Sequence, residues 1–267
     1  MTAGDATAET PCSATRQARE VLERLARAGI VGHLADVVPS SRADVVACLR
    51  ECRPAKLDLG TPAFALEDSL AWMPSKVVVA VGDYAHDYRT AQGVVEYRRF
   101  VEVLRGERRV ATGGNVAKDP YLRGAPFSQG FALLDATPPH LGLRDVFGEG
   151  SVRTARLWAG TRESYTAPHV DLFDNLAIQL LGRKVFNLWH VSDAPLSSCT
   201  SATRTGNFWT VPRSDLPRPR VVVSLDPGQG LVIPAGWIHE VYATSTVVMV
   251  SFFATRVQPA SLRSAMI

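Results

Sequence analysis

The sequence is poor in several features that would assign a protein to a particular class. Only four of its 267 residues are cysteine, and Cys48 and Cys52 have no further Cys or His at zinc-ligand spacing. This pattern predicts reduced thiols rather than a zinc centre or a disulfide framework. Charge of one sign is also scarce, because 29 Lys and Arg against 26 Asp and Glu leave a net charge of +3. Nucleic-acid binding is therefore not expected.

Long hydrophobic runs are missing as well. The longest, such as 77–81 and 247–250, fall far short of the roughly 20 residues that span a bilayer. The polar N-terminus does not resemble a secretory signal, so we expect a cytoplasmic protein without a membrane partner. What the chain does have is 46% hydrophobic residues, enough for a substantial core.

The first 150 residues mix helix and strand signals. Residues 1–13 are predicted to be a flexible tail, because they are small and polar without an apolar period. Apolar spacing predicts helices over 15–28, from Ser40 or Ser41 to the Arg53-Pro54 stop, and over 97–104. The β-branched run 77–81 predicts a buried strand.

After residue 150 the pattern changes to short apolar runs between turn residues. Seven strands without intervening helices indicate an antiparallel sandwich or barrel. No linker divides the chain, so we expect one domain over 14–267, with 14–150 as helical and mixed support and 151–257 as the β core. The predicted strands are 154–159, 175–181, 184–189, 221–225, 230–233, 240–243 and 247–253.

Three side chains have the chemistry of a metal site. His169 and Asp171 are two residues apart, which on a strand places both on one face. That pair is common by chance and needs a third ligand, for which His239, after a turn and at the start of a late strand, is the candidate. Two His and one carboxylate leave three positions open, as in non-haem Fe(II) oxygenases, whereas zinc hydrolases are usually tetrahedral.

Several motifs resemble those of the JmjC-domain, or cupin-8, Fe(II)/2-oxoglutarate oxygenases, in particular small JmjC hydroxylases such as the asparaginyl hydroxylase of the hypoxia response. The resemblance covers about residues 50–255. It implies a double-stranded β-helix (jelly-roll or cupin) core with an N-terminal helical layer. The motifs are Trp158-Ala159-Gly160-Thr161, His169-Val170-Asp171, Asn175, Gln179, Gly182-Arg183-Lys184 and Ile233-Pro234-Ala235-Gly236-Trp237-Ile238-His239.

The resemblance also implies a binding site for the cosubstrate 2-oxoglutarate. Lys184, fifteen residues after the first ligand, is where this family places a lysine that pairs with the distal carboxylate. Related branches of these oxygenases instead use an Arg about ten residues after the last His. This chain has Val248, Met249 and Val250 there, which argues against those branches. Further cosubstrate contacts are implied for Tyr121, Asn175, Thr166 and Ser251, with Tyr165 as the alternative to Thr166.

The expected function is hydroxylation of an unactivated C–H bond in a protein or peptide side chain, or an amino-acid-like substrate, using Fe(II), 2-oxoglutarate and O2 and releasing succinate and CO2. The alternatives are a tailoring hydroxylase of a small-molecule natural product and a non-catalytic cupin-like binding protein; a homodimer is also open. Residues 196–218 are expected to form a loop over the pocket. Three tryptophans, Trp158, Trp189 and Trp237, are expected in the core or pocket wall, and His190 is not expected to be a ligand.

Overall fold

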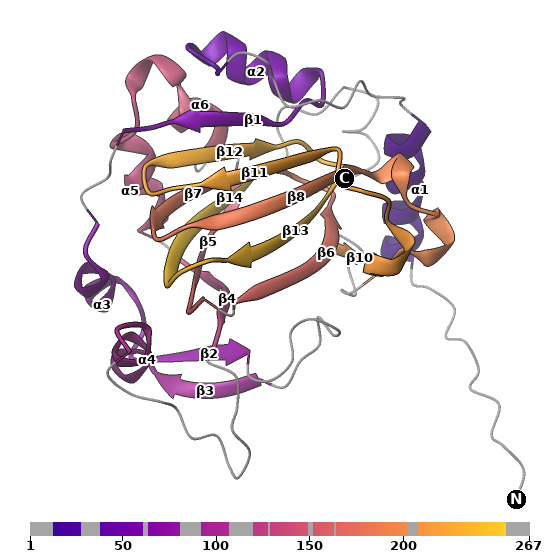
Figure 1. Cartoon of the computed structure of the whole chain (residues 1–267). Helices are drawn as coiled ribbons and strands as arrows, with labels where there is room; N and C mark the ends of the chain where they lie inside the picture. Colours follow the sequence, from indigo (N-terminus) through magenta and orange to yellow (C-terminus); the bar gives the residue numbers. More distant parts are fainter. Residues whose placement is uncertain are drawn as a thin grey trace, which may run out of the picture.

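The fold was determined as a computed structural model that describes residues 13–27, 38–60, 64–80, 92–106, 120–127, 129–148, 152–162, 164–201 and 208–254. Its main component is a pair of antiparallel sheets that face each other (Figure 1). The strands are β1 (Ala55–Asp58), β2 (Lys76–Ala80), β3 (Gln92–Glu96), β4 (Leu122–Pro126), β5 (Val152–Gly160), β6 (Tyr165–Asp171), β7 (Asp174–Leu181), β8 (Lys184–His190), β9 (Thr200–Ser201), β10 (Phe208–Thr210), β11 (Val221–Leu225), β12 (Gln229–Ile233), β13 (Trp237–Ala243) and β14 (Val247–Ala254).

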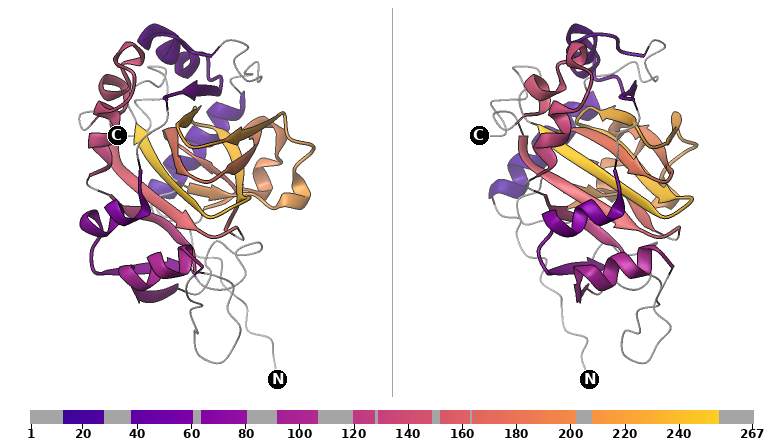
Figure 2. Two further views of the ribbon diagram at one scale, coloured as in Figure 1. Left: turned by 60° about the vertical axis from the view of Figure 1, so that its left-hand side comes forward. Right: turned by 90° about the vertical axis from the view of Figure 1, so that its left-hand side faces the viewer.

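The strand order is that of a double-stranded β-helix. One sheet runs β1-β12-β7-β14-β5-β4 and the other β11-β8-β13-β6-β10-β9, so that β5 to β8 alternate between the two sheets. All of the pairings are antiparallel. A separate hairpin of β2 and β3 lies beside β4 at one end of the molecule (Figures 1 and 2). The predicted jelly-roll, or cupin, core is confirmed.

Short helices surround this core. α2, α5 and α6 lie at the end of the molecule opposite the β2-β3 hairpin, and α3 and α4 lie near that hairpin. α1 lies against the sheet that contains β6 and β10 (Figures 1 and 2). No helix within the described residues is long and apolar enough to cross a membrane. The helices are α1 (Ser13–Arg27), α2 (Arg42–Arg50), α3 (Ser69–Trp72), α4 (Tyr97–Leu104), α5 (Gly130–Asp135) and α6 (Leu143–Phe147), with 3-10 turns η1 (Leu66–Asp68), η2 (Pro139–Leu141), η3 (Val191–Asp193), η4 (Leu196–Ser198) and η5 (Arg213–Asp215).

The hydrophobic residues divide into layers that follow the two sheets. β7 and β14 are buried along almost their whole length, because one face of their sheet meets the opposite sheet and the other meets the helices. β11 alternates between buried and more exposed residues, as expected for a strand with one solvated face. The space between the sheets, where inward side chains from both converge, is therefore where a pocket can form.

Most of the predicted elements are present. α4 has the predicted bounds, and α2 is capped by Ser41, whose hydroxyl accepts a hydrogen bond from the Asp44 backbone N–H. Residues 1–12 of the predicted tail lie outside the described residues, but Ser13 belongs to α1.

Two details of the N-terminal half differ from the sequence prediction. The strand expected to be buried at 77–81 is β2, and Val78 is 52% exposed because its hairpin has one open face. The second detail is β1, because the sequence analysis predicts no strand at residues 55–58, yet Ala55–Asp58 is a strand paired with β12. Four residues with only two buried positions are too short for a periodic signal.

Candidate metal centre and its pocket

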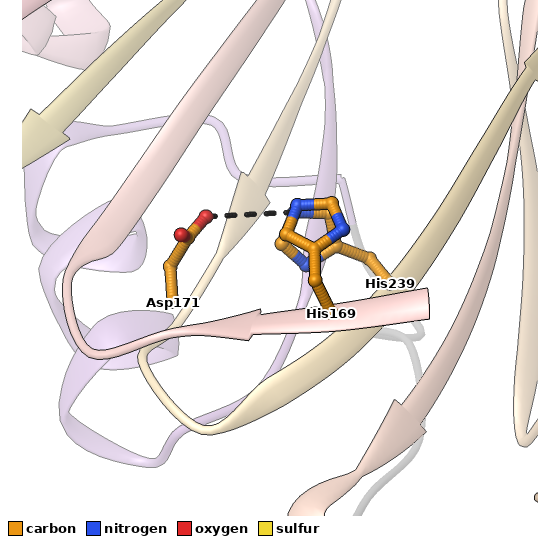
Figure 3. Close-up of side chains that lie close together, drawn as sticks. All are labelled: His169, Asp171 and His239. Carbon is orange, nitrogen blue, oxygen red and sulfur yellow. Dashed lines mark ion pairs between the residues drawn. The ribbon is translucent and has the colours of Figure 1, made fainter. Parts of the chain in front are cut away.

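Three polar side chains meet between the sheets. His169 and Asp171 lie on β6, and His239 lies on β13 directly across from His169. Because cross-strand partners and residues two apart share a face of a sheet, all three side chains point inward (Figure 3). One ligand atom from each lies within 4.8 Å of the others, and all three residues are buried. The sequence-predicted ligands are therefore brought together.

Both imidazoles are oriented by backbone carbonyls. The Nδ1 atom of His169 lies 2.8 Å from the Ala167 carbonyl oxygen, and that of His239 lies 3.1 Å from the Trp237 carbonyl oxygen. A carbonyl accepts only, so each Nδ1 donates and each Nε2 is left with its lone pair. The His239 Nε2 points at Asp171, 3.6 Å from its Oδ2. This arrangement is typical of metal-binding histidines.

Burial sets the protonation states of the three residues. It lowers the pKa of His239 to about 4 and, with a smaller effect from His239 and Arg123, lowers the pKa of His169 well below its usual value. Both rings are therefore neutral at pH 7, the form that binds metals. Burial raises the pKa of Asp171 to about 7, because the charged carboxylate loses contact with water.

The donor set fits a divalent transition metal. Two imidazole nitrogens and one carboxylate on one side leave the opposite side open, which suits Fe(II) in oxygenases. One potential ligand atom from each of the three residues lies within 4.8 Å of the others, which is close enough for the three to hold one ion.

One pocket contains the centre and every other residue predicted to touch the cosubstrate. Its walls come from both sheets and from Tyr121, just before β4. The free space in this pocket is only about 20 Å³. The lining is Tyr121, Trp158, Thr166, His169, Asp171, Asn175, Ala177, Lys184, Phe186, His239, Val241, Met249, Ser251 and Phe253.

Lys184 is a buried cation in this pocket. It is 1% exposed, and its Nζ donates to the Tyr121 hydroxyl at 3.3 Å and lies 5.5 Å from the Tyr121 ring centre and 5.9 Å from that of Trp158. Within the described part of the chain, no carboxylate lies within ion-pair distance of it. A buried charge without a counter-ion is unfavourable and is found mainly where a ligand supplies the opposite charge.

The remaining predicted contacts are polar groups in the same pocket. The Thr166 hydroxyl lies 3.3 Å from that of Tyr121, and the side-chain oxygen of Asn175 is buried without a hydrogen-bond partner among the described residues. Ser251 is buried on β14. Tyr165, the alternative to Thr166, points to the other face of the sheet, where its hydroxyl donates to Glu240 at 2.6 Å. Thr166 is therefore the pocket residue of the two.

Several apolar wall residues were not singled out from the sequence, although a simple signal was available. Ala177, Phe186 and Val241 each follow a predicted site residue by two positions, and Met249 and Phe253 flank Ser251 by two. A search two positions before and after each predicted site residue would have found all five, because residues two apart on a strand share a face of the sheet. These residues make the pocket mostly apolar.

The segment expected to form a loop over the pocket is more ordered than predicted. Among residues 196–201 and 208–218 the structure has β9 and β10, and β10 pairs with β6 so that Thr210 lies opposite His169. The ring of Phe208 stacks on the His169 ring with centroids 4.6 Å apart. This added strand covers the metal ligands from the side, a contact that sequence spacing could not reveal.

The tryptophans and His190 are as expected. Trp189 and Trp237 are fully buried, and Trp158 forms part of the pocket wall. His190 is buried away from the pocket lining, and its Nδ1 lies 2.8 Å from the Ser192 hydroxyl. Cys48, Cys52 and Cys199 are free thiols.

The match to a protein family agrees with this architecture. No curated protein matches the sequence. Among solved structures, the chain is similar to an X-ray structure of Escherichia coli ycfD (16% identity, TM-score 0.48) and to the Escherichia coli ribosomal oxygenase YcfD (17% identity, TM-score 0.48). The alignments cover 82% of this chain but 54% and 52% of those proteins, so it spans about half their length. Residues 65–258 match the cupin-like domain family, cupin-8, and the chain belongs to that family.

Proposed function

We propose that this protein is an Fe(II)- and 2-oxoglutarate-dependent oxygenase that hydroxylates an unactivated C–H bond in a protein or peptide side chain. The observation that supports the proposal is one pocket containing both a His-Asp-His triad and the buried, uncompensated ammonium of Lys184. A metal site alone would need no such cation, and a cation alone would need no metal site. Together they fit a chelating ligand with a distal carboxylate.

His169, Asp171 and His239 would hold the iron. When bound there, Fe(II) and 2-oxoglutarate would use O2 to hydroxylate a C–H bond, with release of succinate and CO2. The protein contributes neutral imidazoles, fixed by the Ala167 and Trp237 carbonyls, so that the ligands need little reorganisation.

Lys184 and Tyr121 would bind the cosubstrate. The ammonium forms a charge-assisted pair with the distal carboxylate, and the Tyr121 hydroxyl, already in contact with both Lys184 and Thr166, adds a second donor. The wall formed by Phe186, Val241 and other apolar side chains excludes water, which strengthens these interactions.

The test is anaerobic titration of the protein with Fe(II), followed by 2-oxoglutarate, while the weak visible charge-transfer band of the chelate is recorded. We expect a band that saturates at one equivalent of each. In His169→Ala the band should be lost. His140→Ala, on the exposed η2 turn, is the matched control and should keep it.

The same titration separates this proposal from a non-catalytic cupin-like binding protein. A binding protein with structural His and Asp residues would give no band in any variant. A band that persists in His169→Ala would show that the metal binds elsewhere, and would contradict the assignment of the triad.

A further inference from the structure

A second and much larger hollow lies beside the metal pocket. Its volume is about 530 Å³, against about 20 Å³ for the metal pocket. It is formed by β2, by β4 and by the turn around Met73 and Pro74 that precedes β2. We call it the β2–β4 groove. A volume of this size is typical of a binding site for a sizeable ligand.

The groove exists because two strands pair at one end only. Ala80 and Tyr121 exchange both backbone hydrogen bonds, at 2.8 and 3.0 Å, and this is the one bridge between β2 and β4 that the described residues form. Beyond it the strands separate. β4 is the last strand of its sheet, and β2 pairs only with β3 in the part of the chain described. Two strand edges therefore flank the groove.

The groove adjoins the metal pocket. Tyr121 forms the bridge at its closed end and also lines the metal pocket. Gly124, in the groove wall, packs against the indole of Trp158, which lines the metal pocket on its other side. The groove and the metal pocket are therefore adjacent at Tyr121 and at the contact between Gly124 and Trp158.

The charge of the groove has one sign. Of the described residues that line it, Lys76 and Arg123 are cations and none is acidic. Glu96 faces Lys76 across the hairpin but is paired with Arg99 at 3.2 Å. Such a wall favours an anionic ligand.

We infer that the β2–β4 groove binds the substrate as an extended polypeptide segment with acidic side chains, and that Arg123 is the residue that selects them. The five residues of β2 extend over roughly 16 Å, longer than a small carboxylic acid. Strand edges on both sides suit an extended chain, whose backbone pairs with the edges while its side chains meet the walls. The inference rests on the proposed function for the claim that this segment is the substrate, but the binding itself can be measured without turnover.

The experiment uses the full chain and three fluorescein-labelled ten-residue peptides in which Thr alternates with Glu, Gln or Lys. Binding is followed by fluorescence anisotropy. The Glu peptide should bind at least about tenfold more tightly than the Gln peptide, the range for one charge-assisted contact. Hydrogen exchange should slow in β2 and β4 when the Glu peptide is bound.

Arg123→Gln should remove most of the preference for Glu over Gln, and Lys76→Gln should reduce it by a few-fold. The matched control is Arg50→Gln, an exposed arginine on α2 at the other end of the molecule (Figures 1 and 2), which should keep the preference. Equal binding of the three peptides, or a preference that survives in Arg123→Gln, would overturn the inference. Displacement of the Glu peptide by N-acetylglutamate at equal carboxylate concentration would identify a small acid as the ligand, and would also overturn it.

The two proposals fail separately. Loss of Fe(II) and 2-oxoglutarate binding in the wild-type protein would contradict the proposed function whatever the peptides do. If Mn(II) binding in Arg123→Gln stays within threefold of wild type while the peptide preference is lost, Arg123 acts on the substrate and not on the metal. A larger loss of Mn(II) binding would instead assign Arg123 to the metal centre and contradict its role in selection.

Discussion

Replacing Lys184 by methionine should stabilise the empty protein and at the same time remove most of its response to 2-oxoglutarate. The reason is that the ammonium is buried without a carboxylate partner among the described residues, so that it opposes folding until a ligand supplies the opposite charge. Methionine has a similar length and fills the same space without a charge. A lysine retained only for packing would show the reverse.

The magnitude follows from the contacts. Burying an ammonium costs several kcal/mol. Against this stand one 3.3 Å contact with the Tyr121 hydroxyl, worth about 1 kcal/mol, and two aromatic rings at 5.5 and 5.9 Å, worth about 0.5–2 kcal/mol each. A net penalty of about 2 kcal/mol corresponds to a rise in Tm of about 4–8 °C in Lys184→Met.

The ligand response should change in the opposite direction. At a concentration of 100 times its Kd, 2-oxoglutarate stabilises the wild type by about 2.7 kcal/mol. Loss of the charge pair should weaken binding about 100-fold. The same concentration then equals the Kd of the variant, and the stabilisation falls to about 0.4 kcal/mol.

The assay is thermal unfolding with Mn(II) bound, with and without 2-oxoglutarate. Lys56→Met is the matched control, because Lys56 on β1 donates to the Ser224 carbonyl outside the pocket. It should keep the full ligand response. The reasoning is refuted if Lys184→Met unfolds at a lower temperature than the wild type, or if 2-oxoglutarate raises the Tm of the variant as much as it raises that of the wild type.

Three other substitutions test the surroundings of the site. Burial raises the pKa of Asp174 to about 7, so the folded state keeps the proton of this carboxyl to higher pH than the unfolded state does, and the wild type loses stability as pH rises from about 4 to 7. In urea unfolding, the stability of Asp174→Asn relative to the wild type should therefore increase by a few kcal/mol across that pH range. A difference in stability that does not change with pH would contradict this. Phe208→Ala removes the ring stacked on His169 and should weaken Mn(II) binding several-fold in calorimetry, whereas unchanged affinity would show that β10 has no positioning role. Gly182→Ala would place a methyl group 1.8 Å from the Thr246 carbonyl oxygen and should lower the free energy of unfolding by more than about 2 kcal/mol. The control Gly106→Ala, also at positive φ but in open space, should lower it by about 1 kcal/mol. Equal losses of stability in denaturant unfolding would exclude the clash.

The sequence was most informative where strand periodicity and spacing act together. Seven of the strands from residue 152 onward lie close to the predicted runs, because short apolar runs between turn residues leave a direct pattern. The strand β6, which carries His169 and Asp171, was not among the predicted runs. The eight predicted site residues line one pocket because each sits on the inward face of its strand or at its start. Their roles toward metal and cosubstrate stay predictions until the titrations above are done.

The features that the sequence did not reveal depend on contacts between distant segments. Phe208 reaches His169 only because β10 adds to the edge of β6, and no local pattern specifies that pairing. Arg123 looks like an ordinary charged residue until the separation of β2 from β4 places it in a groove wall. Both are set by tertiary structure, which overrides local propensity in short strands.

The metal centre depends finally on the register of one strand. A slip of β13 by a single residue would turn His239 to the outer face and bring Glu240 or Ile238 inward. Glu240 opposes such a slip. Its two carboxylate oxygens accept hydrogen bonds from Tyr165 on β6, at 2.6 Å, and from Asn187 on β8, at 2.7 Å, so that it ties β13 to both neighbouring strands. A polar network on the outside of the sheet thus holds His239 opposite His169 on the inside, which gives the buried Glu240 a structural role directly after a candidate metal ligand.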